Sequence, residues 1–166
     1  RPPRSTLFPY TTLFRSTDMQ AAIGCAQLQK LPGFVEARRR NFAYLSERLQ
    51  CVREYFILPE VCENSEPSWF GFMITCREGV DKNKVVRYLE ENGIQTRMLF
   101  AGNLTKQPCF DEMHKTGVGY RIVGELTNTD HIMENTFWIG VYPGMTTEML
   151  NYMVEKITET VSMPCD

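Results

Sequence analysis

Residues 68–100 read SWFGFMITCREGVDKNKVVRYLEENGIQTRMLF, and their pattern predicts a strand, a helix and a second strand. Its first part, residues 68–76, alternates large apolar side chains with others, a pattern typical of a β-strand. Asp81 is a suitable N-cap for a following helix, and Asn92–Gly93 ends that helix because glycine tolerates a left-handed backbone. Residues 94–100 predict a second strand. The side chains expected on one face of the first strand are Phe70, Phe72, Ile74 and Cys76, and those expected on the buried face of the helix are Val85, Val86 and Leu89.

Further strands and helices are predicted on both sides of this unit. Residues 55–58 indicate a short strand, and residues 136–141 (TFWIGV) indicate another. Thr146 is a candidate N-cap for a final helix, and a short helix is predicted near residues 127–134. Residues 101–119 are rich in glycine, proline and polar side chains and are expected to be irregular. The order of elements indicates an α+β fold, with a small mixed sheet covered by helices.

The segment TDMQAAIGCAQLQKL, residues 17–31, predicts a helix capped by Thr17-Asp18. Pro32 either breaks this helix or begins a second one, because proline fits the first turn of a helix but not its interior. Another backbone could pack closely against the first helix at its small residues, which are Ala21, Ala22, Gly24, Cys25 and Ala26. The second helix would direct one apolar stripe toward the core, made of Phe34, Val35, Phe42, Leu45 and Leu49.

Composition places the chain among ordinary globular proteins. It has 166 residues, of which 43% are hydrophobic and 23% charged, and a formal net charge of −2. No apolar run approaches the ~20 residues that span a bilayer, which argues against a membrane segment. The sequence pI of 5.8 and the lack of a long basic tract argue against a nucleic-acid partner.

The cysteine pattern argues against both a disulfide framework and a metal site. The chain contains no CxxC pair, and neither of its two histidines, His114 and His131, is spaced like a zinc ligand beside a cysteine. We therefore expect reduced cysteines in a cytoplasmic protein, and no metal site. The cysteines are Cys25, Cys51, Cys62, Cys76, Cys109 and Cys165.

Residues 1–16 read RPPRSTLFPYTTLFRS and differ in kind from the rest. They contain three prolines, three arginines and no acidic residue, without helical or strand periodicity. A basic tail is one interpretation. Residues 6–16, however, resemble the conceptual translation of a sequencing-library adapter, which favours a non-native tail over residues 1–16. The natural sequence would then be a fragment that begins near Thr17, and residues 17–166 carry a net charge of −5.

The chain lacks the motifs of self-contained active sites, such as GxSxG, HExxH, the P-loop and GxGxxG. Four longer stretches nevertheless carry a resemblance over residues 17–162. Through them the chain resembles the DegT/DnrJ/EryC1/StrS sugar aminotransferase family. FAGNLTKQP and GELTNTD are similar to one branch of that family, the 3-dehydrases of CDP-4-keto-6-deoxy-D-glucose in lipopolysaccharide biosynthesis. The four stretches are TDMQAAIGCAQLQKLPGFVEARRRNFAYL, SWFGFMIT, GIQTRMLFAGNLTKQPCF and YRIVGELTNTDHIMENTFWIGVYPG.

This resemblance implies a fold-type-I pyridoxal-phosphate enzyme, of which residues 17–166 would be the smaller C-terminal domain. In the aminotransferases a lysine holds the cofactor as a Schiff base. In the dehydrase branch a histidine replaces it and acts as general base while the C3 hydroxyl group is lost. The resemblance also implies pyridoxamine or pyridoxal phosphate, an iron–sulfur cluster, a separate electron-transfer reductase and a homodimer. The catalytic residues and cluster cysteines would lie upstream, so no catalytic residue is expected in this chain.

Four residues are candidates for the wall of the substrate site. Phe70 matches a family position close to the cofactor, where the aminotransferases typically carry a histidine. Arg97 and Asn103 are candidates for binding the nucleotide diphosphate, because arginine matches phosphate geometry. His131 stands where the branch is expected to carry an arginine, and would make a weaker substrate contact. The structural alternatives are a core aromatic for Phe70, a strand-edge charge for Arg97 and a satisfied histidine for His131.

Three interpretations of function stay open. The first is a fragment of a nucleotide-sugar 3-dehydrase that acts on a 4-keto-6-deoxy sugar nucleotide, favoured by Phe70 and GNLTKQP. The second is a fragment of a pyridoxal-phosphate sugar aminotransferase, which an upstream lysine at the cofactor position would establish. The third is a non-enzymatic interaction module with no cofactor domain upstream. We expect the chain alone to be catalytically inactive.

Overall fold

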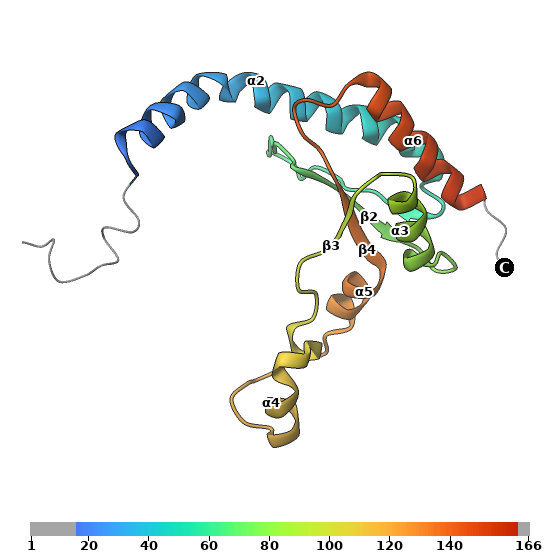
Figure 1. The fold of residues 1–166 in the computed structure, drawn as a ribbon. Helices are drawn as coiled ribbons and strands as arrows, with labels where there is room; N and C mark the ends of the chain where they lie inside the picture. The colour runs from blue at the N-terminus through green and yellow to red at the C-terminus, as the bar shows by residue number, and fades with distance from the viewer. Residues whose placement is uncertain (1–15, 163–166) are drawn as a thin grey trace, which may run out of the picture.

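The computed structural model describes residues 16–162, which form a four-stranded sheet with helices packed against it (Figure 1). This arrangement confirms the predicted α+β class. The strands are β1 (Phe56–Ile57), β2 (Gly71–Cys76), β3 (Thr96–Met98) and β4 (Thr136–Gly140). The α-helices are α2 (Asp18–Arg48), α3 (Lys82–Glu91), α4 (Asp111–Thr116), α5 (Thr127–Asn135) and α6 (Thr147–Ser162), and the 3₁₀ helices are η1 (Leu49–Val52), η2 (Leu104–Lys106) and η3 (Pro108–Phe110).

The sheet has the order β1-β2-β4-β3 and is antiparallel throughout, so the predicted mixed sheet is wrong. β2, α3 and β3 do form the expected strand–helix–strand unit, but β3 does not pair with β2. β4 lies between them, and its Trp138 stands opposite Met73 of β2 and opposite Arg97 of β3. β2 and β3 therefore run in the same direction without sharing hydrogen bonds, an arrangement known as a split β-α-β unit.

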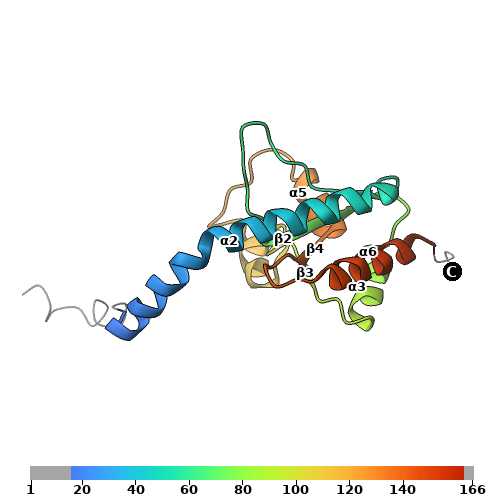
Figure 2. The same cartoon turned by 90° about the horizontal axis from the view of Figure 1, so that it is seen from above.

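One face of the sheet carries the core. Phe72 and Ile74 of β2 and Phe137 and Ile139 of β4 are fully buried there, because successive side chains of a strand point to opposite faces. Figure 2 shows α2 and α6 lying across the sheet. The helix residues that complete this core are Phe42, Leu45, Val85, Val86, Leu89, Leu150, Met153 and Ile157.

α2 is one continuous helix of 31 residues, so the predicted break at Pro32 is wrong. It begins with a capping box, in which Thr17 and Gln20 exchange backbone-to-side-chain hydrogen bonds. Residues 18–34 are exposed and extend away from the sheet (Figures 1 and 2). Water can therefore bind the carbonyl group that Pro32 leaves without an N–H partner. Although α2 is long, neither it nor any other helix within residues 16–162 is apolar enough to cross a membrane.

Residues 99–126, which we call the arm, project beyond the end of β3 (Figure 1). Sequence patterns predicted an irregular segment over residues 101–119 and missed its three short helices, η2, η3 and α4. α4 ends at Gly117, whose φ of +68° suits glycine. The arm lines an open pocket of about 200 Å³ whose walls include Phe110, Met113 and Tyr120.

Candidate functional site

The face of the sheet opposite the core is less buried, and we call it the open face. Phe70 lies in a bend just before β2 and is 55% exposed. Its ring meets the indole of Trp138 edge-on, with ring centroids 5.2 Å apart. Trp138 alternates with the buried Phe137, so Phe70 belongs to the open face. The prediction that Phe70 shares a face with Phe72 is therefore wrong, because the bend breaks the strand alternation.

Trp138 lies against the backbone of β2 at Gly71. A Cβ atom added at Gly71 would come within 2.6 Å of Trp138 Cε3, closer than real side chains approach. A larger residue at Gly71 would therefore displace the indole, and with it the edge contact to Phe70. Glycine at this position sets the geometry of the aromatic pair.

Arg97 lies on β3, directly opposite Trp138. Its side chain is exposed, and it makes no hydrogen bond or ion pair with any other residue between positions 16 and 162. An exposed guanidinium group without an acidic partner is available to bind an anion, and arginine matches phosphate oxygens particularly well.

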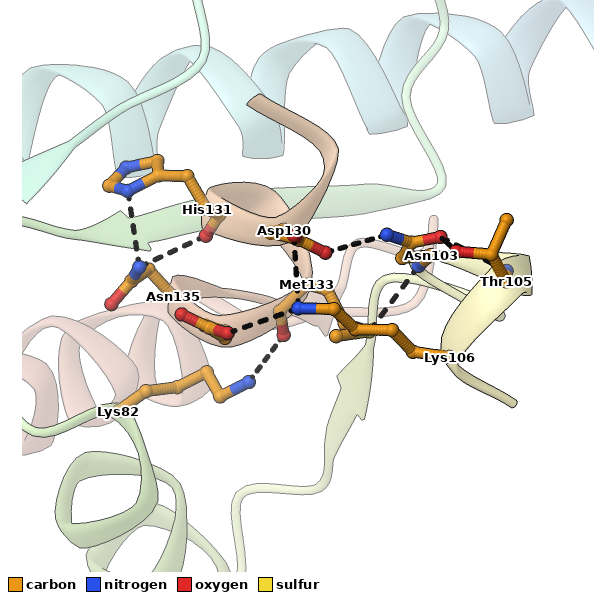
Figure 3. Close-up of polar contacts among 9 residues, drawn as sticks. Lys82, Asn103, Thr105, Lys106, Asp130, His131, Met133 and Asn135 are labelled. Atoms are coloured by element: carbon orange, nitrogen blue, oxygen red, sulfur yellow. Dashed lines mark hydrogen bonds and ion pairs between the residues drawn. The ribbon is translucent and has the colours of Figure 1, made fainter. Parts of the chain in front are cut away.

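Asn103 joins the arm to α5 (Figure 3). Only 2% of Asn103 is exposed. Its Oδ1 accepts hydrogen bonds from the backbone N–H of Thr105 (3.0 Å) and from Thr105 Oγ1 (2.7 Å), which caps η2. Its Nδ2 donates to Asp130 Oδ1 at 2.6 Å. Both functional groups of this predicted site residue are thus engaged within the chain.

Asp130 is the partner that sequence reasoning missed. Its Oδ2 lies 2.9 Å from Lys106 Nζ, which is also 4.0 Å from Glu134 Oε1 (Figure 3). The hydrogen bond from Asn103, and then the one from Lys106, hold the pKa of Asp130 below its ordinary value. Asn103, Lys106 and Asp130 form what we call the latch, which ties the start of the arm to the first turn of α5. An acidic residue in the first turn of a helix is common, so the sequence carried no distinctive signal for it.

His131 lies outside the latch. It is exposed on α5, and its Nδ1 is 3.2 Å from Nδ2 of Asn135, one helical turn later. Figure 3 shows this pair on the other side of α5 from Asn103. The structure thus brings Asn103 together with Asp130 and Lys106, and places Phe70 and Arg97 beside Trp138. It does not bring His131 into either group.

The described cysteines are free, and Cys165 lies outside the described residues. Within residues 16–162 no three cysteine, histidine, aspartate or glutamate side chains are grouped so that they could hold a metal ion. Cys76 is fully buried in the core, and this burial raises the pKa of its thiol to about 11 although Lys82 opposes the shift.

Cys76 is expected to be the unreactive thiol among the described cysteines. The thiolate is the reactive form, and a pKa of about 11 instead of 9.0 lowers its population near pH 8 by about 100-fold. Labelling with an aromatic disulfide reagent, followed by peptide mass mapping, should modify the exposed cysteines first and Cys76 only after unfolding in guanidinium. Labelling of native Cys76 at the rate of the others would show that the core opens. The exposed cysteines are Cys25, Cys51, Cys62 and Cys109.

Comparison with known proteins gives consistent similarities. The model of the DegT/DnrJ/EryC1/StrS aminotransferase family matches residues 10–158. The chain is 56% identical over 145 residues to the lipopolysaccharide biosynthesis protein RfbH of Salmonella typhimurium, covering 86% of this chain and 32% of that protein. It is 44% identical over 150 residues to dTDP-4-dehydro-2,6-dideoxy-D-glucose 3-dehydratase of Saccharopolyspora spinosa, covering 89% of this chain and 31% of that protein.

A solved structure gives the same result. The E. coli GDP-4-keto-6-deoxy-D-mannose-3-dehydratase with bound hydrated PLP superposes with a TM-score of 0.71 at 28% identity, covering 84% of this chain and 34% of that one. The chain spans about a third of the length of the curated relatives that it matches. The family model covers most of the chain, and the sequence and fold similarities agree with it. This chain belongs to the DegT/DnrJ/EryC1/StrS aminotransferase family.

Proposed function

We propose that this chain is part of a nucleotide-sugar 3-dehydrase, which removes the C3 hydroxyl group of a 4-keto-6-deoxy sugar nucleotide for lipopolysaccharide dideoxysugars. The 44% identity to a relative named as a 3-dehydratase carries this proposal. The likeness to a lipopolysaccharide biosynthesis protein supports the biological setting. The open face adds support, because Phe70 presents an apolar ring where the family's aminotransferases typically carry a histidine. Such a ring neither donates nor accepts a proton.

The residues of this chain fit only part of the implied cofactor set. Pyridoxamine or pyridoxal phosphate, when bound, would supply an electron sink for the loss of the C3 hydroxyl group. The exposed ring of Phe70 fits a flat aromatic cofactor as an apolar wall. An iron–sulfur cluster does not fit the described residues, which contain no group of three ligating side chains. Any cluster would be held elsewhere in the protein of which this chain would be a part, which we call the longer protein.

The remaining candidate residues take substrate-side roles in this proposal. Arg97 would bind the diphosphate with its unpaired guanidinium group. Asn103 would contribute by holding the arm in place, since its amide is engaged with Thr105 and Asp130. His131 would contact substrate only at the rim of the site.

The wider assembly is also a proposal. Residues 17–166 would be the smaller domain of a cytoplasmic homodimer that receives electrons from a separate reductase. Residues 1–16 would be a non-native tail, and all of them except Ser16 lie outside the described residues. The longer protein would bind the nucleotide sugar and carry the catalytic residues.

The longer protein is expected to form a 3-deoxy sugar nucleotide from CDP-4-keto-6-deoxy-D-glucose, pyridoxamine phosphate and an electron-donating reductase. Residues 1–166 alone should form none under the same conditions. Mass spectrometry of the nucleotide products measures both outcomes. Turnover by residues 1–166 alone would contradict the placement of the catalytic residues elsewhere.

The second candidate function is sugar aminotransfer, which the family description itself favours. It predicts an amino sugar nucleotide with glutamate as amino donor, and a lysine instead of a histidine at the cofactor position of the longer protein. Formation of that product with no 3-deoxy product would replace the dehydrase proposal. A non-enzymatic module is the least supported alternative, because two of the relatives above are named as dehydratases.

A further inference from the structure

Phe100 stands in a backbone conformation that phenylalanine rarely adopts. Its φ is +47°, in the left-handed region, where a Cβ atom crowds the following carbonyl oxygen. It occupies a tight turn, in which its N–H donates to the carbonyl oxygen of Met98 (2.8 Å) and the N–H of Gly102 donates to that of Leu99 (3.3 Å). The ring is 76% exposed. The fold thus holds a large apolar side chain in a disfavoured conformation and leaves it in solvent.

The structure fixes this turn from both sides. β3 pairs with β4 immediately before it. After it, a Cβ atom added at Gly102 would lie 2.4 Å from Cγ of Met133, and Met133 Sδ accepts the backbone N–H of Asn103 at 3.3 Å. The latch then holds Asn103 itself. Backbone strain that is held in place by surrounding contacts, as at Phe100, is typical of functional sites, whereas a loose loop would relax to an unstrained conformation.

The chemistry next to Phe100 indicates what the ring contacts. Arg97 lies three residues earlier on the same segment, exposed and without a partner among residues 16–162. Its guanidinium group suits phosphate oxygens, whereas an exposed aromatic ring suits the flat face of a base. A cation and an aromatic ring within one short segment match the two parts of a nucleoside diphosphate.

We propose that the Phe100 ring stacks on the base of the nucleotide sugar while Arg97 binds its diphosphate. This inference rests on the proposed function and adds the group that binds the nucleoside. It also gives the latch a role, because the latch holds in place the turn that exposes the Phe100 ring. Phe100 is then a binding residue whose backbone strain is maintained for that contact.

The test uses the longer protein and three variants of Phe100, namely Phe100→Gly, Phe100→Asn and Phe100→Tyr, together with Arg97→Gln. Glycine and asparagine tolerate a positive φ but lack the ring, so their melting temperature should be unchanged or up to about 4 °C higher. Calorimetric titration with CDP, dTDP and GDP should show about tenfold or greater loss of affinity for the best-bound nucleotide. Phe100→Tyr keeps a ring and should restore binding to within about threefold.

Inorganic pyrophosphate is the matched control ligand, because it has no base to stack. Its affinity should be unchanged in Phe100→Gly and should fall in Arg97→Gln, which should weaken nucleotide binding as well. Equal nucleotide binding by wild type and Phe100→Gly overturns the inference, as does loss of pyrophosphate and nucleotide binding together. A lower melting temperature with unchanged nucleotide affinity also overturns it, because the ring would then pack against another part of the protein.

Failure of this inference is separable from failure of the proposed function. Product formation by the wild-type longer protein reports on the dehydrase reaction, whatever the affinities of the variants. A wild-type protein that binds none of the three nucleotides overturns the stacking contact, whereas the product assay alone decides between dehydration and aminotransfer.

Discussion

Phe72→Ala is expected to lower the free energy of unfolding of this chain by about 3–5 kcal/mol, whereas Phe70→Ala should lower it by about 1 kcal/mol or less. Phe72 is fully buried and packs against Phe42, with ring centroids 5.1 Å apart. Its removal leaves a cavity that the core cannot close. Phe70 is half-exposed and loses only its edge contact with Trp138.

Urea unfolding followed by far-ultraviolet circular dichroism measures both changes. The two variants are matched, because each deletes the same ring from positions two residues apart. If Phe72→Ala unfolds the chain completely, the more conservative Phe72→Leu should give a smaller but measurable loss. Similar losses for Phe70→Ala and Phe72→Ala would place both rings on one face, as strict strand alternation predicted.

The sequence predicted the features that depend on neighbouring residues, namely the helix caps and the apolar faces of single helices and strands. Asp81 caps α3 by accepting hydrogen bonds from the backbone N–H groups of Asn83 and Lys84. In the same way Thr146, which precedes α6, accepts a hydrogen bond at Oγ1 from the backbone N–H group of Met149. The backbone N–H groups in the first turn of any helix have no partner within the helix, and these capping side chains accept hydrogen bonds from them. The apolar spacing of α3 and of β2 beyond Phe70 likewise reflects burial against a single core.

The features that the sequence did not reveal depend on distant parts of the chain or on solvent. Insertion of β4 between β2 and β3 is a long-range pairing that no local pattern encodes. Pro32 is tolerated within α2 because that half of the helix is exposed. Asp130 binds Asn103 across 27 positions of sequence, so the latch could not be found from spacing.

Asn103→Asp is expected to reverse the pH dependence of the latch. In the wild type, the lowered pKa of Asp130 means that the latch is intact above the ordinary aspartate range and weakens as pH falls through that lowered pKa. The variant replaces the donating amide, 2.6 Å from Asp130 Oδ1, with a second carboxylate. Two carboxylates repel each other at that distance, so the closed latch of the variant requires a proton shared between them, and this proton is lost at neutral pH. The latch of the variant should therefore be open at neutral pH and close again on acidification.

Hydrogen exchange of the arm amides measures this opening, after correction for the intrinsic effect of pH on exchange. An unsatisfied buried polar group costs about 1–3 kcal/mol, so exchange in η2 should be about 10- to 100-fold faster in the variant at neutral pH. Amides of β4 and α6 should be unaffected, because they belong to the core. The double variant Asn103→Asp/Asp130→Asn exchanges donor and acceptor and should recover most of the protection at neutral pH. Protection of η2 that is retained at neutral pH in Asn103→Asp but lost in the double variant would show instead that the ion pair between Lys106 and Asp130, rather than the amide hydrogen bond, holds the arm.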